Sequence, residues 1–205
     1  MDRRGRTAWF GAPAWRVAAL FMLACGVARA ADVPQLVANV CVACHGAEGN
    51  SLVPSFPKLA GLQAEYLSKQ LKDYLSGKRK NEVMAPALAS MKDDDIPALA
   101  AYFARQTATP GKVEDPALAS AGKKLYEDGN VEAGVPACAG CHQPKGEGNV
   151  RYPRLAGQHQ AYTLQQMMDF KTGARANDKG KVMRAVAERM SEQEMKTVSE
   201  YLAGL

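Results

Sequence analysis

Two short cysteine–histidine runs are the parts of this sequence best suited to chemistry. One spans residues 41–45 (CVACH) and the other residues 138–142 (CAGCH). Two thiols three positions apart on a helical turn can reach the vinyl groups of one porphyrin, and the adjoining imidazole can then bind its iron. This spacing is the attachment signature of c-type haem, so we expect two covalently attached haem c groups. The predicted attachment residues are Cys41, Cys44, Cys138 and Cys141, and the predicted iron ligands are His45 and His142.

Two other kinds of site use paired cysteines, and neither fits this pattern well. A structural zinc site places its two cysteine pairs about 15–20 residues apart, whereas here they are 97 residues apart and each has its own histidine. A thioredoxin-like dithiol needs a βαβ context, which the sequence lacks. Haem attachment is therefore the favoured interpretation.

The first 30 residues have the organisation of a secretory signal peptide. Four arginines precede or begin a short apolar core at residues 17–27, and Ala28-Arg29-Ala30 matches the small-x-small cleavage pattern. We expect cleavage after Ala30 and a periplasmic mature protein. The apolar core is shorter than the roughly 20 residues of a membrane span, so retention as an anchor is the less favoured alternative. Lipid attachment at Cys25 fits the sequence less well still.

Removal of this segment changes the charge of the chain. The full sequence has a net charge of +5, but residues 31–205 hold 21 basic and 20 acidic side chains. The basic balance belongs to the signal peptide, so nothing indicates a nucleic-acid partner. Apart from the four cysteines of the two runs, only Cys25 remains, and it leaves with the signal peptide. No disulfide is expected.

The mature sequence is one unit used twice. Residues 56–61 (FPKLAG) recur as residues 152–157 (YPRLAG), and five further identities follow at the same offset of 96. They are Tyr66 with Tyr162, Gln70 with Gln166, Asp73 with Asp169, Gly77 with Gly173, and Arg79 with Arg175. The stretch 106–116 (QTATPGKVEDP) has the composition of a linker. We divide the chain into residues 1–30, 31–109 and 110–205.

Apolar residues within each unit repeat with a helical period, and we find no sustained alternation that indicates strands. The predicted fold is all-α: two tandem domains, each a few short helices wrapped around a covalently bound haem. Units of fewer than 100 residues have little core of their own, and a buried porphyrin supplies the missing apolar surface.

The identity of a sixth ligand decides whether each haem carries electrons or binds other molecules. Methionine is the usual partner, and two pairs occupy repeat-matched positions: Met84 with Met183, and Met91 with Met190. A capping box at residues 191–194 (SEQE) gives Met190 a role in a hydrophobic staple instead. We therefore predict Met84 and Met183, in loops, as the iron ligands, with Met91 the alternative to Met84.

These motifs, in this order and repeated, resemble cytochrome c4, a family of dihaem class I cytochromes c from bacterial periplasms. The resemblance covers about residues 40–205. It implies that the carbonyl groups of Pro57 and Pro153 hold the two histidines, and that Arg79 and Arg175 lie near the haem propionates or the domain interface. It also implies that Gly122 allows close helix packing, whereas the N-terminal helix of the first unit, with Leu36 near the expected glycine, is short or irregular.

The resemblance implies an electron carrier rather than an enzyme. The expected partners are redox proteins: a terminal oxidase as acceptor and a cytochrome bc1 complex as donor, with peripheral membrane association compatible with both. Basic residues near the predicted methionines are candidates for steering acidic partners: Lys78, Arg79, Lys80, Lys179, Lys181 and Arg184. The alternative function is the cytochrome subunit of a dehydrogenase complex, such as flavocytochrome sulfide dehydrogenase. A haem peroxidase is a third alternative, but it would need an open or displaceable sixth site, and both units offer a methionine.

Overall fold

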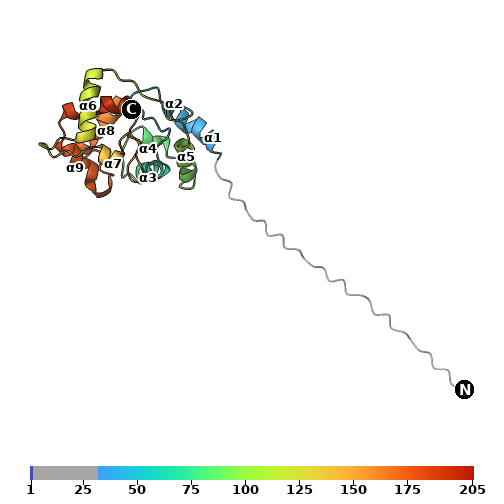
Figure 1. Ribbon diagram of the computed structural model, residues 1–205. Coiled ribbons are helices and arrows are strands. Elements are labelled where there is room, and N and C mark those ends of the chain that lie inside the picture. The colour runs from blue at the N-terminus through green and yellow to red at the C-terminus, as the bar shows by residue number, and fades with distance from the viewer. Residues whose placement is uncertain (2–31) are drawn as a thin grey trace.

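The protein folds into two helical units that lie side by side (Figure 1). The computed structural model describes Met1 and residues 32–205, so the predicted signal segment and its cleavage site lie outside the described residues. In this part of the chain every regular element is helical, and the β-structure is limited to one isolated bridge between Asn130 and Val135. The predicted all-α fold is thereby confirmed.

The elements of the two units follow the chain in the same general order. The first unit contains α1 (Val33–Leu36), the π-helical η1 (Val37–Cys41), α2 (Val42–His45), α3 (Ala64–Leu75), α4 (Met84–Ala87) and α5 (Asp95–Ala104). The second unit contains α6 (Pro116–Asp128), α7 (Ala139–His142), α8 (Gln160–Thr172), the 3₁₀-helical η2 (Lys179–Lys181), α9 (Val182–Arg189) and α10 (Glu192–Ala203).

The two units begin differently, as expected from their sequences. Helix α6 has an ordinary start, because the Asp115 carboxylate accepts hydrogen bonds from two backbone N–H groups and Pro116 occupies the first helical position. In the first unit α1 lasts only one turn and passes through the π-helical η1 into α2. Gly122 allows α6 to pack closely on α10, because a Cβ atom there would lie 2.2 Å from the carbonyl oxygen of Thr197, whereas the first unit has Leu36 near the equivalent position.

Each unit has its own apolar core. In the second unit the core lies where α6, α8 and α10 meet, and its most enclosed side chains include Tyr126, Met195 and Val198. In the first unit a smaller cluster joins η1, α3 and α5, with Leu99 and Phe103 at its centre. Cys41 and Cys138, two of the predicted haem-attachment residues, border these clusters, so both cores are continuous with the predicted porphyrin sites.

The predicted linker is fixed to both units along its length. The side chain of Asn50 bonds to the backbone of Thr107 and Thr109, and the Lys58 ammonium donates to the carbonyl oxygens of Thr109 and Pro110 at 3.0 and 2.8 Å. At its other end the linker donates two backbone N–H groups to the buried carboxylate of Glu200 on α10. These bonds anchor the connection in both halves.

The contact of Gly122 with α10 yields the first prediction. Alanine normally favours a helix over glycine by about 1 kcal/mol. At position 122 we nevertheless expect Gly122→Ala to destabilise the holoprotein by about 1–3 kcal/mol, because α6 must move away from Thr197. Urea unfolding measures the change, with Ser120→Ala on the exposed face of α6 as the control. An unchanged or raised stability of the Gly122→Ala protein would show that the helices are not in this contact.

Candidate functional site

Each histidine of the two cysteine–histidine runs is held by a proline carbonyl group. Nδ1 of His45 lies 2.8 Å from the carbonyl oxygen of Pro57, and Nδ1 of His142 lies 2.9 Å from that of Pro153. Both imidazoles are almost fully buried. The arrangement expected from the family resemblance is therefore present in both units, and its two copies have nearly the same length.

These bonds determine which nitrogen of each ring is free. A carbonyl oxygen can only accept a hydrogen bond, so Nδ1 must carry the proton, and Nε2 of the neutral ring then keeps its lone pair. Nε2 of His142 is buried and has no hydrogen-bond partner anywhere in the described part of the chain. A buried nitrogen of this kind normally has a partner, and the iron of a bound haem would supply one.

The chemical state of the side chains also suits haem. Burial lowers the pKa of His45 and of His142, although the proline carbonyl groups oppose this effect. Both rings are therefore neutral at pH 7, the form that binds a metal. Burial raises the pKa of the Cys41 and Cys138 thiols to about 11, and none of the four cysteines of the runs is used in a disulfide. The residues present fit covalently attached haem in each unit.

The two predicted methionine ligands lie at the starts of helices, so their expected placement in loops was wrong. Met84 is the first residue of α4, and its backbone N–H donates to the side chain of Asn81 at 2.9 Å. Met183 is the second residue of α9. There the carboxylate of Asp178 accepts hydrogen bonds from the backbone N–H and side chain of Arg184, at 3.1 and 2.7 Å.

Asn81 and Asp178 are positioning residues that the sequence analysis did not identify. They fix the first turns of α4 and α9 and so limit where the methionine side chains point. Burial alone would raise the pKa of Asp178, but its bonds to Arg184 hold it below the ordinary value. Little in the sequence indicates this role, because asparagine and aspartate are common before any helix and do not single out one that carries an iron ligand.

The other methionine pair has a structural role. Met190 is buried in the core of the second unit, directly before the capping box that Ser191 and Glu194 complete at the start of α10. Met91 packs against the core of the first unit. This agrees with the expectation that Met190 serves packing. The choice of Met84 over Met91 as a ligand stays a prediction.

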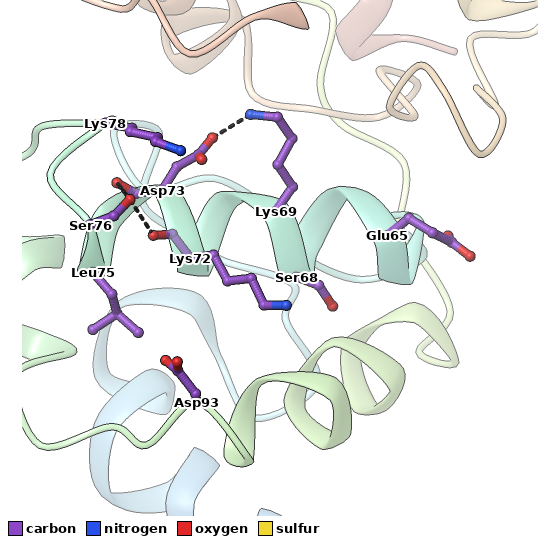
Figure 2. A pocket seen from close by; sticks show the side chains of 9 residues that line it. All are labelled: Glu65, Ser68, Lys69, Lys72, Asp73, Leu75, Ser76, Lys78 and Asp93. Atoms are coloured by element: carbon purple, nitrogen blue, oxygen red, sulfur yellow. Dashed lines mark hydrogen bonds and ion pairs between the residues drawn. The ribbon is translucent and has the colours of Figure 1, made fainter.

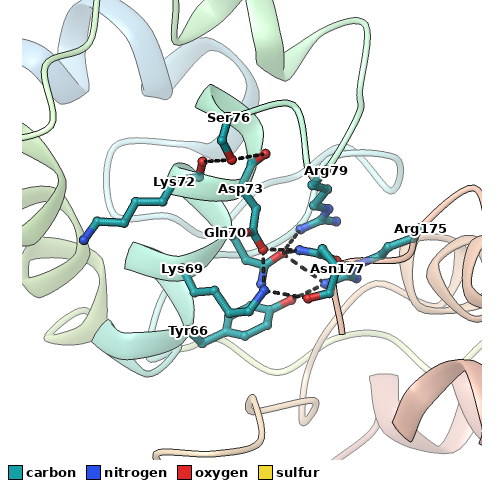
Figure 3. Close-up of polar contacts among 9 residues, drawn as sticks. All are labelled: Tyr66, Lys69, Gln70, Lys72, Asp73, Ser76, Arg79, Arg175 and Asn177. Carbon is teal, nitrogen blue, oxygen red and sulfur yellow. Dashed lines mark hydrogen bonds and ion pairs between the residues drawn. The ribbon is translucent and has the colours of Figure 1, made fainter. Parts of the chain in front are cut away.

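A polar cluster joins the two units (Figure 3). The Arg79 guanidinium donates to Gln70 of its own unit and to Tyr162 and Gln166 of the other, at 2.7–3.0 Å. Arg175 makes the repeat-equivalent bonds to Gln166, Tyr66 and Gln70, at 2.9–3.2 Å. Six of the residues shared by the repeats, three from each unit, thus meet at one interface, which has approximate two-fold symmetry.

The two arginines of this cluster are not solvated surface groups. Each is buried, and each stacks on an aromatic ring of its own unit, Tyr74 for Arg79 and Phe170 for Arg175. The expectation that Arg79 belongs to a basic rim around Met84 was therefore wrong. Arg184 is also engaged, because it pairs with Asp178. Exposed lysines near the two methionines remain: Lys78, Lys80, Lys179 and Lys181.

The acceptors of Arg79 and Arg175 are neutral, since neither arginine forms an ion pair with any residue in the described ranges. Burial would raise the pKa of Tyr66, but the positive charges of Arg175 and Arg79 hold it below its ordinary value. Two buried cations without a carboxylate partner form a site suited to added negative charge.

A groove of about 700 Å³ lies along α3 and shares Lys69 and Asp73 with the edge of this polar cluster (Figure 2). Its lining alternates in charge, with Lys69 and Asp73 joined as an ion pair and Lys72 and Asp93 nearby. None of the predicted haem-attachment residues or iron ligands lines it. The groove therefore has no part in the candidate site.

Comparison with known proteins places these features in context. The family model described as Cytochrome c matches the chain twice, at residues 30–106 and 119–205. The chain is 50% identical over 170 residues to cytochrome c4 of Thiocapsa roseopersicina, which covers 82% of this chain and 88% of the relative. It is 37% identical to a thiosulfate dehydrogenase electron acceptor of Stutzerimonas stutzeri, with 82% and 80% covered. The reduced recombinant cytochrome c4 of Pseudomonas stutzeri superposes with a TM-score of 0.81 at 44% identity, covering 86% of this chain and 98% of that structure.

The polar cluster yields a prediction about how the two units are held together. Arg79→Met removes three hydrogen bonds, two of them to the second unit. We expect it to lower the free energy of unfolding of the holoprotein by about 1–3 kcal/mol in urea titrations. Lys80→Met changes an exposed neighbour and should have an effect within about 0.5 kcal/mol. Equal effects of the two substitutions would mean that the cluster does not stabilise the interface.

Proposed function

We propose, from the premise that this chain belongs to the cytochrome c family as a cytochrome c4-like dihaem electron carrier, that it passes single electrons between periplasmic redox proteins through two His/Met haems. The observation that carries this proposal is the pair of buried histidines, each with Nδ1 committed to a carbonyl group and Nε2 free to bind iron. When bound, each haem supplies an iron centre that gains and loses one electron.

The protein has to keep one coordination geometry in both oxidation states. We assign haem attachment to the four cysteines of the two runs and the axial positions to His45 with Met84 and His142 with Met183. The carbonyl groups of Pro57 and Pro153 prevent ring rotation and increase the basicity of the imidazoles. The methionine thioethers would supply the sixth ligand and would raise the reduction potential.

Arg79 and Arg175 would interact with the haem propionates. Their guanidinium groups are buried between the units and have neutral acceptors. Propionate carboxylates would supply the negative charge that this site lacks, and they would do so close to both haems. In this role each arginine would connect a haem propionate to hydrogen-bond partners in the other unit.

The redox partners are the less defined part of the proposal. We propose a terminal oxidase as acceptor and a cytochrome bc1 complex as donor. A second candidate is supported by the similarity to a thiosulfate dehydrogenase electron acceptor, which favours a dehydrogenase as the donor. Rapid mixing of the oxidised protein with each reduced donor separates the two, because only a physiological donor reduces it within the time of turnover.

We propose a periplasmic location, reached by the signal peptide of residues 1–30 and its cleavage after Ala30. Covalent attachment of haem to exported thiols is consistent with this route. Among the described residues, none of the helices has the length and apolar character needed to cross a bilayer. Mass spectrometry of the protein purified from the periplasmic fraction tests the proposal, because a mature chain that begins at Ala31 is expected.

The methionine assignment gives the test of the carrier function. Met84→Ala should open the sixth position of the first haem, and Met183→Ala that of the second. Each variant should bind carbon monoxide at one haem in the reduced state and lose one high-potential step in an optical redox titration. The unsubstituted protein should bind none at neutral pH.

Met91→Leu and Met190→Leu are the matched controls, because both side chains pack in the cores. They should retain both redox steps and should not bind carbon monoxide. If Met91→Leu opened the first haem and Met84→Ala did not, Met91 would be the ligand. Carbon monoxide binding by the unsubstituted protein would favour a haem enzyme over a carrier.

A further inference from the structure

The peptide group that holds His45 is also bonded to the other unit. Its carbonyl group, from Pro57, accepts the Nδ1 proton of His45 at 2.8 Å. Its N–H group belongs to Lys58 and donates to Oε1 of Gln158, in the second unit, at 2.9 Å. One peptide plane therefore lies between the predicted axial histidine of the first haem and an amide side chain of the second unit.

The second unit contains the reciprocal arrangement. The carbonyl group of Pro153 accepts the Nδ1 proton of His142 at 2.9 Å, and the N–H group of the same peptide belongs to Arg154. That N–H donates to Oε1 of Gln63, in the first unit, at 2.9 Å. Each histidine is thus joined to a glutamine of the opposite unit through two hydrogen bonds and one peptide group.

The orientation of both glutamines is fixed by their second bond. Nε2 of Gln158 donates to the carbonyl oxygen of Lys58 at 2.9 Å, and Nε2 of Gln63 donates to that of Glu147 at 2.8 Å. A carbonyl group cannot donate and a backbone N–H cannot accept, so only one amide orientation satisfies both contacts. The oxygen of each glutamine must therefore face the peptide N–H.

The chemistry of such a chain is directional. When the peptide N–H donates a hydrogen bond to the glutamine oxygen, the peptide group is polarised and its carbonyl oxygen becomes a stronger acceptor. A stronger acceptor draws the Nδ1 proton away from the ring and makes Nε2 a better electron donor to iron. The oxidised iron gains most from a better donor, so the reduction potential falls.

We propose that Gln158 and Gln63 are positioning residues that tune the haem of the opposite unit: Gln158 the haem bound by His45, and Gln63 the haem bound by His142. Each acts through the neighbouring proline–lysine or proline–arginine peptide. The proposal rests on the proposed function, because it takes the two histidines as axial ligands. It adds a route by which the packing of one unit sets the redox properties of the other.

The two halves build the same link from different positions of the repeat. The repeat counterpart of Gln158 is Leu62, and that of Gln63 is His159. Gln63 makes both contacts, accepting from a peptide N–H and donating to a backbone carbonyl group. In the second unit these contacts are divided: Gln158 accepts from the peptide N–H, and Nε2 of His159 bonds to the carbonyl oxygen of Ser51 at 2.9 Å. Both chains of bonds are nevertheless present, which indicates a structural requirement rather than an inherited copy.

Gln158→Leu and Gln63→Leu test the proposal in the holoprotein. Leucine is the residue that the chain itself has at position 62, and it removes the acceptor without adding charge. Gln158→Leu should raise the potential of the first haem, and Gln63→Leu that of the second. We expect about a twofold change in the oxidised-to-reduced ratio of the opposite haem, equivalent to about 18 mV for a one-electron couple.

Proton NMR during a redox titration assigns each step to its haem, and the amide signals of Lys58 and Arg154 report the lost bonds. The control is Gln165→Leu on the exposed face of α8, which should leave both potentials unchanged. If a leucine variant fails to fold, Gln158→Met or Gln63→Met replaces it in the same measurement.

A change in the potential of the opposite haem alone distinguishes tuning through the peptide from a general loosening of the interface. A change confined to the variant's own unit, equal changes at both haems, or no change would overturn the proposal. Failure of the proposed function has a different signature, because the unsubstituted protein would then lack two one-electron steps or the spectrum of six-coordinate haem. Two such steps together with an uncrossed response would refute only the link through the glutamines.

Discussion

The hydrogen bond from a buried histidine to a proline carbonyl group is the contact on which the rest of the site depends. It engages Nδ1 and so selects the tautomer that carries the proton there, which leaves Nε2 as the only ring nitrogen able to bind iron. The cysteines of the same run would attach the porphyrin next to this ring. Without the bond the imidazole could rotate, and the coordination geometry that allows rapid electron exchange would not be maintained.

This contact is built into an interface, so the two units act as one body. The proline that holds each histidine is followed by a residue bonded to the other unit, and the linker is attached to both halves. Nearby, the guanidinium groups of Arg79 and Arg175 cross between the units in a symmetric cluster. A carrier with two redox centres benefits from this construction, because a fixed arrangement keeps the separation of the centres constant.

Much of this organisation could be predicted from the sequence. The two cysteine–histidine runs indicate covalent haem chemistry through their spacing, the offset of 96 residues reveals the duplication, and the period of the apolar residues indicates the helical character of each unit. The irregular first helix followed from the absence of a glycine equivalent to Gly122. The capping box before α10 was also readable, because its residues are local in sequence.

The parts that could not be predicted depend on contacts between distant segments. The family resemblance placed Arg79 near the haem propionates or the domain interface, but its neighbours in the sequence do not distinguish it from an exposed arginine, and only the fold shows that it is buried and bonded to Tyr162. Met84 and Met183 were expected in loops, yet each lies in the first turn of a helix that a polar side chain stabilises. Gln63 and Gln158 gave no signal, because they are not repeat counterparts and self-comparison does not pair them.

The central claim is that both irons have histidine and methionine as axial ligands. The proton NMR spectrum of the fully reduced holoprotein tests it most directly, because the ring current of a porphyrin shifts the methyl group of a bound methionine far upfield. The account predicts two such three-proton signals, one from Met84 and one from Met183. A spectrum with one signal or none would contradict it, since at least one haem would then lack a methionine ligand.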